Sequence, residues 1–337
     1  MNYFITGGTG FIGTHLTNLL HEVHPEAKIY NLDIIEPGTP LPTVKNYKPA
    51  LGKGEEHAAT FIYCDVRQTI ELEKVNITPE DVIFNFAAVH RTPGHPDPAY
   101  FETNIRGAEN VCAFAERHGI RKIVFTSSIA PYGAAEELKE ETTLPMPNTP
   151  YGISKLVAEK IHQTWQAGGE GRQLTIVRPG VVFGRGENGN FTRLYWGIRG
   201  HKFMYPGRKD TIKACIYVKE LVRFMLYRLE HHDSGVELYN CCYEPAYTIE
   251  HIVESMKRVT NMKVKVPFMP GWLIMTAAGI AGALGSPMGI CPARVRKLQI
   301  STNICGKKLS ASGYRFHYTF EEALADWYKD NGNLYLQ

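Results

Sequence analysis

Short apolar runs alternate with longer segments of helical period through the first half of the chain. The runs at 2–6, 28–34, 60–65, 81–88, 121–128 and 174–180 have the length of strands. Strands separated by helices are expected to pair in parallel with right-handed crossovers, and strands that are apolar on both faces need helices above and below them. The pattern therefore predicts an α/β fold built on a doubly wound parallel sheet.

The second half of the chain carries shorter and less regular elements. We expect helices near 191–200, 219–230 and 248–259, a strand at 213–218, and a last helix that Thr319 and Glu322 begin with a capping box. The pattern predicts a main domain over 1–184 and a smaller lobe over 185–337. Segments at about 212–240 are expected to return to the main domain, because 214–218 and 237–240 resemble strands.

Composition and charge exclude several classes of protein. With 337 residues, 44% of them hydrophobic and 21% charged, the chain is expected to fold and to bury a large core. Its net charge of +3 is spread along the sequence, which gives no case for nucleic-acid binding but leaves room for a small anionic substrate.

The cysteine pattern and the hydropathy of the chain indicate the cellular compartment in which the protein is expected. The seven cysteines form no C-x-x-C pair, so we expect neither a disulfide framework nor a metal site. The N-terminus lacks the pattern of a secretory signal, and no run reaches the roughly 20 apolar residues of a transmembrane helix. We therefore expect a cytoplasmic protein without a transmembrane segment.

The stretch "YFITGGTGFIGTHLTNLL" carries the most information in the sequence. Gly7, Gly10 and Gly13 follow a predicted strand and begin a helix, with Phe11 and Ile12 between the last two. Glycines in this place permit a tight turn and a close approach of the backbone to a pyrophosphate, which the N-terminus of the helix then attracts. The spacing is G-x-x-G-x-x-G rather than the commoner G-x-G-x-x-G. The stretch predicts a Rossmann-type dinucleotide-binding domain.

Acidic residues follow the next two predicted strands. Asp33 comes 20 residues after Gly13, where a carboxylate can accept hydrogen bonds from the ribose hydroxyls of adenosine. It would repel a 2′-phosphate, and no arginine directly follows it, so NAD is favoured over NADP. Asp65 and the neighbouring Val66 are candidates for contacting the edge of the adenine ring. Asp65 could equally be an acidic residue that lies exposed at the end of a strand and binds nothing.

The stretch "PYGISK" places Tyr151 four residues before Lys155. The same spacing recurs at Tyr205 and Lys209, but there a Pro-Gly pair predicts a turn, whereas Pro150 and the helical period after Gly152 put the first pair on one face of a helix. A nearby ammonium and a nicotinamide ring should lower the pKa of a tyrosine so that it acts as a base. The alternative is a solvated lysine on an ordinary helix.

Two serines, Ser127 and Ser128, end the predicted strand before this helix, and ligands of doubly wound sheets bind at such strand ends. A serine hydroxyl can hydrogen-bond the reacting oxygen and steady it. If the helix carried no active site, these hydroxyls would simply cap the backbone.

Together, "TGGTGFIG", "NFAA", "SS" and "YGISK" resemble the extended short-chain dehydrogenase/reductase family, in particular its nucleotide-sugar epimerases and dehydratases. The later stretches "RPGVVFGRGE", "NFTRLYWGI" and "ACIYVKEL" are similar to that family as well. The resemblance makes Tyr151 the base, Lys155 its partner and holder of the nicotinamide ribose, and Ser128 the serine of a catalytic set.

The resemblance also implies further cofactor and substrate contacts. On the cofactor side these are Ala87, Ala88, Asn104 and Val181, and on the substrate side Ser128, Asn190, Lys213 and Arg294. Where the 4,6-dehydratases of the family carry a Thr-Asp-Glu set, this chain has Ser128, Ile129 and Ala130, so it lacks the acid that would protonate a departing C6 hydroxyl.

These expectations lead to a function with stated alternatives. The first hypothesis is an NAD-dependent 4-epimerase of a UDP-sugar that works by transient oxidation to a 4-keto sugar. A keto-sugar reductase or dehydrogenase linked to NAD(P) would use the same residues, and an NAD-sensing binding protein would keep only the glycine loop. The resemblance also implies a homodimer, formed by the helices that hold Asn104 and Tyr151.

The apolar segment at 272–284 raises one more alternative. It is too short to span a bilayer but could make a weak contact with a membrane interface or cover an apolar substrate. An enzyme like the hydroxysteroid dehydrogenases of the same superfamily, acting on a lipophilic or lipid-linked substrate, would have a use for it. A buried helix or a dimer contact would explain the segment equally.

Overall fold

Seven parallel strands form the central sheet of the protein. The structure is a computed structural model, and it describes residues 1–337 except 40–58, 91–93, 134, 234, 274–275 and 277–298. The strand order is β12-β7-β5-β4-β1-β2-β3. Their bounds are β1 Asn2–Thr6, β2 Lys28–Asp33, β3 Thr60–Tyr63, β4 Val82–Asn85, β5 Lys122–Thr126, β7 Gln173–Pro179 and β12 Val236–Cys241. The predicted doubly wound sheet is confirmed.

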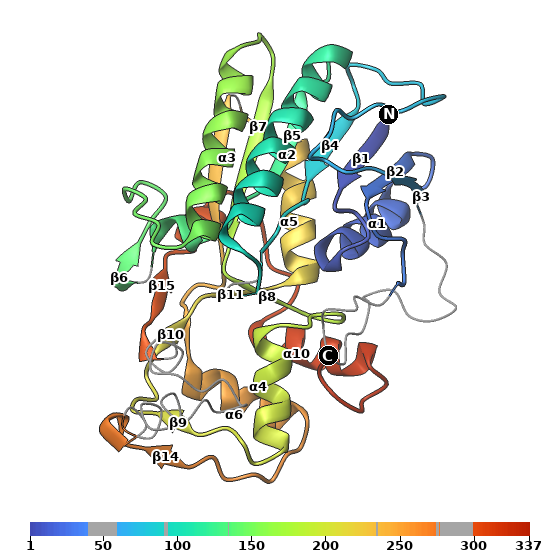
Figure 1. Ribbon diagram of the computed structural model, residues 1–337. Coiled ribbons are helices and arrows are strands. Elements are labelled where there is room, and N and C mark those ends of the chain that lie inside the picture. The colour runs from blue at the N-terminus through green and yellow to red at the C-terminus, as the bar shows by residue number, and fades with distance from the viewer. Residues whose placement is uncertain (40–58, 91–93, 134, 234, 274–275, 277–298) are drawn as a thin grey trace.

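Helices cover both faces of this sheet, as strands that are apolar on both sides require. On one face α1 (Phe11–Val23) and α5 (Val218–Glu230) pack with Tyr3 and Ile5 of β1, and on the other α2 (Asp97–His118) and α3 (Pro150–Ala167) pack with Phe4. Successive residues of one strand thus enter two separate cores, because side chains alternate across a sheet. Figure 1 shows α2 and α3 lying together across the sheet.

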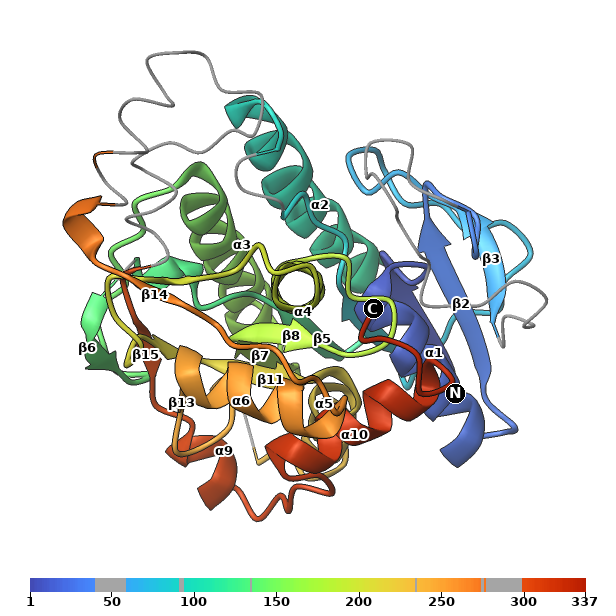
Figure 2. The ribbon, with the colours of Figure 1, turned by 90° about the horizontal axis from the view of Figure 1, so that it is seen from below.

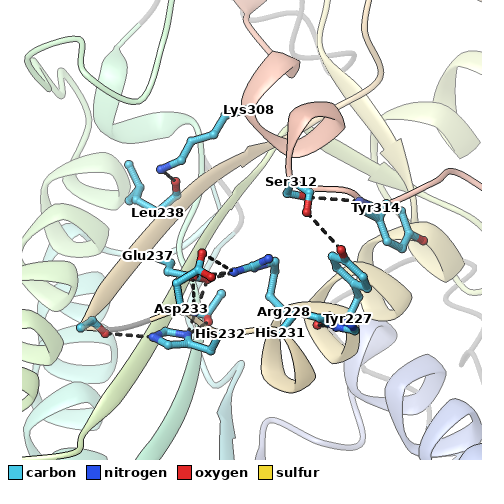
Figure 3. A network of polar contacts seen from close by, with 12 residues as sticks. Tyr227, Arg228, His231, His232, Asp233, Glu237, Leu238, Lys308, Ser312 and Tyr314 are labelled. Atoms are coloured by element: carbon cyan, nitrogen blue, oxygen red, sulfur yellow. Dashed lines mark hydrogen bonds and ion pairs between the residues drawn. The ribbon is translucent and has the colours of Figure 1, made fainter.

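The last strand of the sheet comes from the second half of the chain. The expected strand at 237–240 lies within β12, which pairs with β7. A buried ion pair ties this strand to α5: Arg228 donates through Nε to Glu237 at 3.0 Å and through Nη2 at 2.6 Å (Figure 3). The expected strand at 213–218 is divided into β10 (Ile212–Lys213) and β11 (Cys215–Tyr217), and β11 pairs with β8 (Val181–Phe183) outside the main sheet.

Most elements of the segment that was expected to form a smaller lobe lie below the central sheet in Figure 1. Its helices α4 (Asn190–Arg199), α6 (Ile249–Val259) and α10 (Phe320–Asp330) match three of the four helices expected in the second half, and α5 matches the fourth. Figure 2 shows α6 and α10 together. They enclose an aromatic core that includes Phe183, Phe191, Phe320 and Trp327. The predicted capping box of Thr319 and Glu322 begins α10.

Short strands complete the lobe. A four-stranded sheet runs in the order β13 (Tyr247–Thr248), β10, β15 (Thr302–Ile304) and β6 (Ala135–Lys139), and β9 (Tyr205–Pro206) pairs with β14 (Phe268–Met269). The remaining helical elements are η1 (Ala130–Tyr132) and α9 (Lys307–Ala311). Because β6 comes from the first half of the chain, this sheet joins the lobe to the segment that follows β5.

The apolar segment at 272–284 falls mostly outside the described residues. Of its described positions, Trp272 and Leu273 have 72% and 42% of their surface exposed. Throughout the described ranges, none of the helices combines the length and apolar character that crossing a membrane demands.

Candidate active site

The glycine loop joins β1 to α1 at the carboxyl edge of the sheet. Gly7 has a φ of +70°, and a Cβ placed on it would lie 2.8 Å from the backbone nitrogen of Ala87, so both its conformation and its neighbour exclude a side chain. A Cβ on Gly13 would lie 2.5 Å from the carbonyl oxygen of Gly8. The first turn of α1 therefore packs directly on the loop backbone, as a pyrophosphate cradle requires.

Gly10 is the N-cap of α1, and no acidic residue occupies the first turn of this helix. The first N–H groups of a helix lack partners within it, and its dipole favours an anion at that end. The N-terminus of α1, with Phe11 and Ile12 at its start, can accordingly receive a phosphate group.

Asp33 ends β2 and faces the glycine loop. One carboxylate oxygen accepts a hydrogen bond from the Thr9 backbone N–H at 3.2 Å, and the other accepts from the N–H groups of Ile34 at 2.8 Å and Ile35 at 3.3 Å. Burial raises the pKa of Asp33, and these hydrogen bonds oppose that effect. The carboxylate is thus held beside the loop, where a ribose would approach it.

Asp65 lies in an ion pair at the end of β3. Arg67 Nη2 lies 2.6 Å from one carboxylate oxygen and Nε lies 2.9 Å from the other, and these hydrogen bonds lower the pKa of Asp65. Val66 is buried, and a Cβ on Gly107 of α2 would lie 3.0 Å from its side chain. Arg67 is therefore the ion-pair partner of the acid that was the candidate for the adenine edge, while the Val66 side chain packs in the core against α2.

Asn104 of α2 connects the end of β4 to α3. Its Oδ1 accepts from the Val89 N–H at 2.8 Å, and its Nδ2 donates to the Val89 carbonyl at 3.1 Å and to Ser154 Oγ at 2.8 Å. Ser154 in turn donates to the Tyr151 carbonyl at 2.9 Å. Asn104 thereby fixes the chain after Ala87 and Ala88 against the first turn of the helix that carries Tyr151.

Tyr151 lies in the first turn of α3, where the sequence predicted it. Thr149 caps the helix by accepting from the Gly152 N–H at 3.1 Å, and Pro150 occupies the first turn. Ser128 follows β5, its Oγ accepts from the Ala130 N–H at 3.1 Å, and it lies close enough to the Tyr151 side chain to lower the pKa of the phenol. The structure therefore brings the serine and tyrosine of the predicted set into contact.

Lys155 lies one turn further along α3, with 2% of its surface exposed. Its Nζ lies 4.3 Å from the centre of the Phe125 ring. Burial lowers the pKa of Lys155 to about 7, against the opposing effect of Glu159. This lysine therefore exchanges its proton near neutral pH, which suits a group that works with an acid or base.

Residues 3–242 match the model of the NAD dependent epimerase/dehydratase family. The chain belongs to this family. It is 30% identical over 331 residues to the N-acetyl-alpha-D-glucosaminyl-diphospho-ditrans,octacis-undecaprenol 4-epimerase of Escherichia coli O157:H7, with 96% of this chain and 93% of that protein covered. It is 29% identical over 299 residues to the UDP-glucose 4-epimerase of Halalkalibacterium halodurans, with 80% and 84% covered.

Solved structures share the fold at lower identity. The UDP-glucuronic acid 4-epimerase of Bacillus cereus in complex with NAD superposes with a TM-score of 0.74 at 19% identity, covering 99% of this chain and 100% of that one. The UDP-N-acetylglucosamine 4-epimerase of Methanobrevibacter ruminantium M1 also gives 0.74, at 21% identity and 98% coverage of both chains. The chain is an NAD-dependent enzyme of the extended short-chain dehydrogenase/reductase type.

The residues of the site fit NAD. Gly7 and Gly13 leave the space that a close backbone approach needs, the N-terminus of α1 is free of acidic side chains, and Asp33 can accept from ribose hydroxyls. No arginine directly follows Asp33 to receive a 2′-phosphate. The local chemistry therefore agrees with the cofactor of the family.

For Tyr151 the structure gives the opposite pKa direction from the one expected. Burial raises the pKa of Tyr151 in the protein chain, although the neighbouring Ser128 lowers it in part. The expectation counted the positive charges of Lys155 and of a nicotinamide ring but not the loss of water around the phenol. Desolvation is the larger influence in the chain by itself.

Val181, predicted to contact the cofactor, and the predicted substrate residues other than Ser128 come from the later part of the chain. Val181 begins β8, Asn190 begins α4 and accepts from Arg193 Nη2 at 2.8 Å, and Lys213 of β10 donates to the Ile300 carbonyl at 2.7 Å. Arg294 lies outside the described residues. Asn190 and Lys213 thus each make a side-chain hydrogen bond within the lobe itself.

Two buried residues next to the site were missed by the sequence reasoning. Glu159 lies on α3 four residues after Lys155, and it pairs with Arg178 of β7. The spacing of one helical turn could have pointed to Glu159, because residues four apart share a face. Nothing in the local sequence could have pointed to Arg178 as its partner.

Proposed function

We propose that the enzyme is a 4-epimerase of a sugar that is joined to a diphosphate, with a UDP-sugar as the first candidate. The arrangement of Ser128, Tyr151 and Lys155 beside the glycine loop carries this proposal. Ser128 lies beside the Tyr151 side chain and lowers the pKa of the phenol, and burial lowers the pKa of Lys155 to about 7. All three lie near the carboxyl end of the parallel sheet, where ligands of doubly wound folds bind.

In the proposed reaction, Tyr151 removes the proton of the sugar C4 hydroxyl. NAD, held by the glycine loop, Asp33 and Lys155, would supply the reversible oxidation at C4 that allows the hydrogen to return on the other face of the sugar. Ser128 donates a hydrogen bond to the C4 oxygen and keeps it aligned with Tyr151. Protonated Lys155 favours the deprotonated form of Tyr151, which afterwards returns its proton to the C4 oxygen.

Cofactor and substrate contacts follow from the same arrangement. The cofactor would lie along the glycine loop and the ends of β2, β3 and β4, touching Gly7, Gly10, Phe11, Ile12, Gly13, Asp33, Asp65, Val66, Ala87, Ala88, Asn104, Tyr151, Lys155 and Val181. Asn190 at the N-terminus of α4 would bind the diphosphate of the substrate, with Lys213 and Arg294 as further phosphate ligands. Ile129 and Ala130 supply no acid at C6, so 4,6-dehydration is disfavoured.

A lipid-linked sugar diphosphate is the second candidate substrate. The relative from Escherichia coli O157:H7, named for an undecaprenol-linked sugar, matches 96% of this chain. Phe268, Trp272 and Leu273 have exposed apolar side chains within six residues of one another. A polyprenyl chain could lie against such a surface, whereas a UDP-sugar has no need of it.

An epimerisation assay without added NAD tests both candidates. UDP-glucose, UDP-N-acetylglucosamine and N-acetylglucosaminyl-diphospho-undecaprenol are each incubated with the purified enzyme, and the products are separated by chromatography. Formation of the 4-epimer with no net absorbance change at 340 nm supports epimerisation, and the substrate that turns over identifies the class. Stoichiometric formation or loss of NADH would instead identify a net dehydrogenase or reductase.

Tyr151→Phe is the matched control for this assay. It removes the phenol oxygen and leaves the ring, so turnover should fall by a factor of about a thousand or more while NAD remains bound. Turnover near the wild-type rate in this variant would show that another group takes the proton.

We further propose that the enzyme is a cytoplasmic homodimer formed through α2 and α3. Ile153 on α3 is 39% exposed, and Leu156 and Val157 beside it are half-buried, so this helix presents an apolar surface. The cysteines among the described residues are free thiols, which suits a reducing compartment. Sedimentation equilibrium, with Ile153→Glu as the disrupting variant, tests the dimer.

A further inference from the structure

We propose that Glu159 is a positioning residue of the active site. It locks the strand end that carries Ser128 to the helix that carries Tyr151 and Lys155. This inference rests on the proposed roles of those three residues and adds a residue that acts on them through its neighbours.

Glu159 lies on the inner face of α3 with 1% of its surface exposed. Its Oε1 accepts hydrogen bonds from Ser127 Oγ and from Arg178 Nε, the latter at 2.8 Å, and its Oε2 accepts from Arg178 Nη2 at 2.6 Å. Ser127 directly precedes Ser128. One carboxylate on the helix of the tyrosine therefore holds the backbone on which the serine is mounted.

The strand side of this contact is fixed as well. The Ser127 N–H donates to the Val177 carbonyl at 2.8 Å, and the Ile129 N–H donates to the Pro179 carbonyl at 3.3 Å, so the chain on both sides of Ser128 is bonded to β7. Arg178 lies between these two acceptors in the sequence. The Glu159–Arg178 pair thus joins α3 to the same stretch of β7 that positions the serine.

A further contact extends this support to the segment after Ser128. The guanidinium carbon of Arg178 lies 4.6 Å from the centre of the Tyr132 ring, and the Tyr132 hydroxyl donates to Asn240 Oδ1 at 2.9 Å. The segment that contains Ser128 is consequently held at both of its ends. A small displacement of a catalytic group can cost a large factor in rate, so this support has a consequence for turnover.

A buried ion pair could also serve stability alone, because removing one partner leaves an uncompensated charge. Ser127 separates the two roles. Ser127→Ala deletes the hydrogen bond from the strand end to Glu159 but leaves the Glu159–Arg178 pair complete. Thr126→Val is the matched control: it removes a neighbouring buried hydroxyl that has no hydrogen-bond partner among the described residues.

The first measurement is steady-state epimerisation by the NAD-loaded enzyme. We expect Ser127→Ala to lower kcat about tenfold with KM nearly unchanged, while the loss of one buried hydrogen bond lowers the unfolding temperature by only a few degrees. Thr126→Val should keep the wild-type kcat. A kcat for Ser127→Ala within twofold of wild type, or an equal loss in Thr126→Val, would overturn the positioning role.

The second measurement does not depend on knowing the substrate. Tyrosinate absorbance is followed as pH rises in each variant and in the same variant with Tyr151→Phe, and the difference gives the pKa of Tyr151. Because the neighbouring Ser128 lowers that pKa, Ser127→Ala should raise it while Thr126→Val does not. An unchanged pKa in Ser127→Ala contradicts the proposal.

The two measurements also separate the proposals from each other. If wild-type enzyme epimerises none of the three sugars but Ser127→Ala still raises the Tyr151 pKa, the proposed substrates are wrong and the positioning role stands. If wild type turns over and Ser127→Ala changes neither kcat nor pKa, the positioning role alone is wrong.

Discussion

Replacing the buried lysine of the proposed active site should make the protein more stable while removing the proposed activity. Lys155 has 2% of its surface exposed, and burial lowers its pKa from 10.5 to about 7. The folded protein must therefore either bury a charge or give up a proton that the unfolded chain holds. Methionine has a similar length and no charge, so Lys155→Met removes this cost and keeps most of the packing.

The size of the effect follows from the two pKa values. At pH 7 the unfolded lysine is fully protonated and the folded one about half, so the proton linkage costs the folded state about 4 kcal/mol. The contact of Lys155 Nζ with the Phe125 ring, at 4.3 Å from its centre, offsets about 1 kcal/mol of this cost. Lys155→Met should therefore raise the free energy of unfolding by about 3 kcal/mol at pH 7.

The sign of the pH dependence is also determined. Between the folded pKa near 7 and the unfolded value of 10.5, the unfolded chain binds more protons, so the stability of the wild-type protein rises with pH in that window. At pH 9 the linkage cost is about 2 kcal/mol, and because the folded lysine is then neutral and makes no cation–π contact, the advantage of Lys155→Met should be about 2 kcal/mol.

Urea unfolding of the NAD-free proteins at pH 6, 7, 8 and 9, followed by tryptophan fluorescence, measures these differences. Lys160→Met, at an exposed position of the same helix, is the control and should change the free energy of unfolding by less than about 0.5 kcal/mol. Equal stability of wild type and Lys155→Met at pH 7, or a difference that stays constant with pH, would refute the reasoning.

Three further changes test the cofactor loop and its support. Gly13→Ala places a Cβ 2.5 Å from the Gly8 carbonyl oxygen, so the loop must shift and NAD affinity should fall at least about tenfold in an isothermal titration. Asn104→Ala leaves the Val89 N–H and carbonyl without their partner and should lower the free energy of unfolding by about 2 kcal/mol in urea. Asp33→Ser removes the carboxylate that repels a 2′-phosphate, so the ratio of NADP to NAD affinity should rise; an unchanged ratio would mean that another group selects the cofactor.

The parts of the fold that the sequence predicted correctly are those that local interactions specify. Each strand of the first half is an apolar run on its own, and the capping box of Thr319 and Glu322 is completed within one turn of α10. The glycine loop is likewise local, because Gly7, Gly10 and Gly13 follow a strand and begin a helix within a few residues. Motifs of this kind are recognisable because their residues touch neighbours in the sequence.

The pairing of strands in the second half could not be predicted in the same way. The stretches 214–218 and 237–240 both have strand character, yet β11 pairs with β8 and β12 alone joins the main sheet. The choice depends on partners far away in the chain, since Val236 of β12 pairs with Leu174 of β7. Propensity measures one segment at a time and carries no information about its neighbour in space.

The same distinction holds for the active site. The sequence by itself made Tyr151 and Lys155 candidates, because a helix start and a spacing of one turn are local features, and the family resemblance favoured Ser128 over Ser127. The tertiary structure alone decided how these groups behave. Burial within the fold lowers the pKa of Lys155 to about 7. Strand β7 places Arg178 where it can pair with Glu159 of α3. Desolvation and ion pairing depend on what surrounds a residue in three dimensions, and only the folded chain supplies those surroundings.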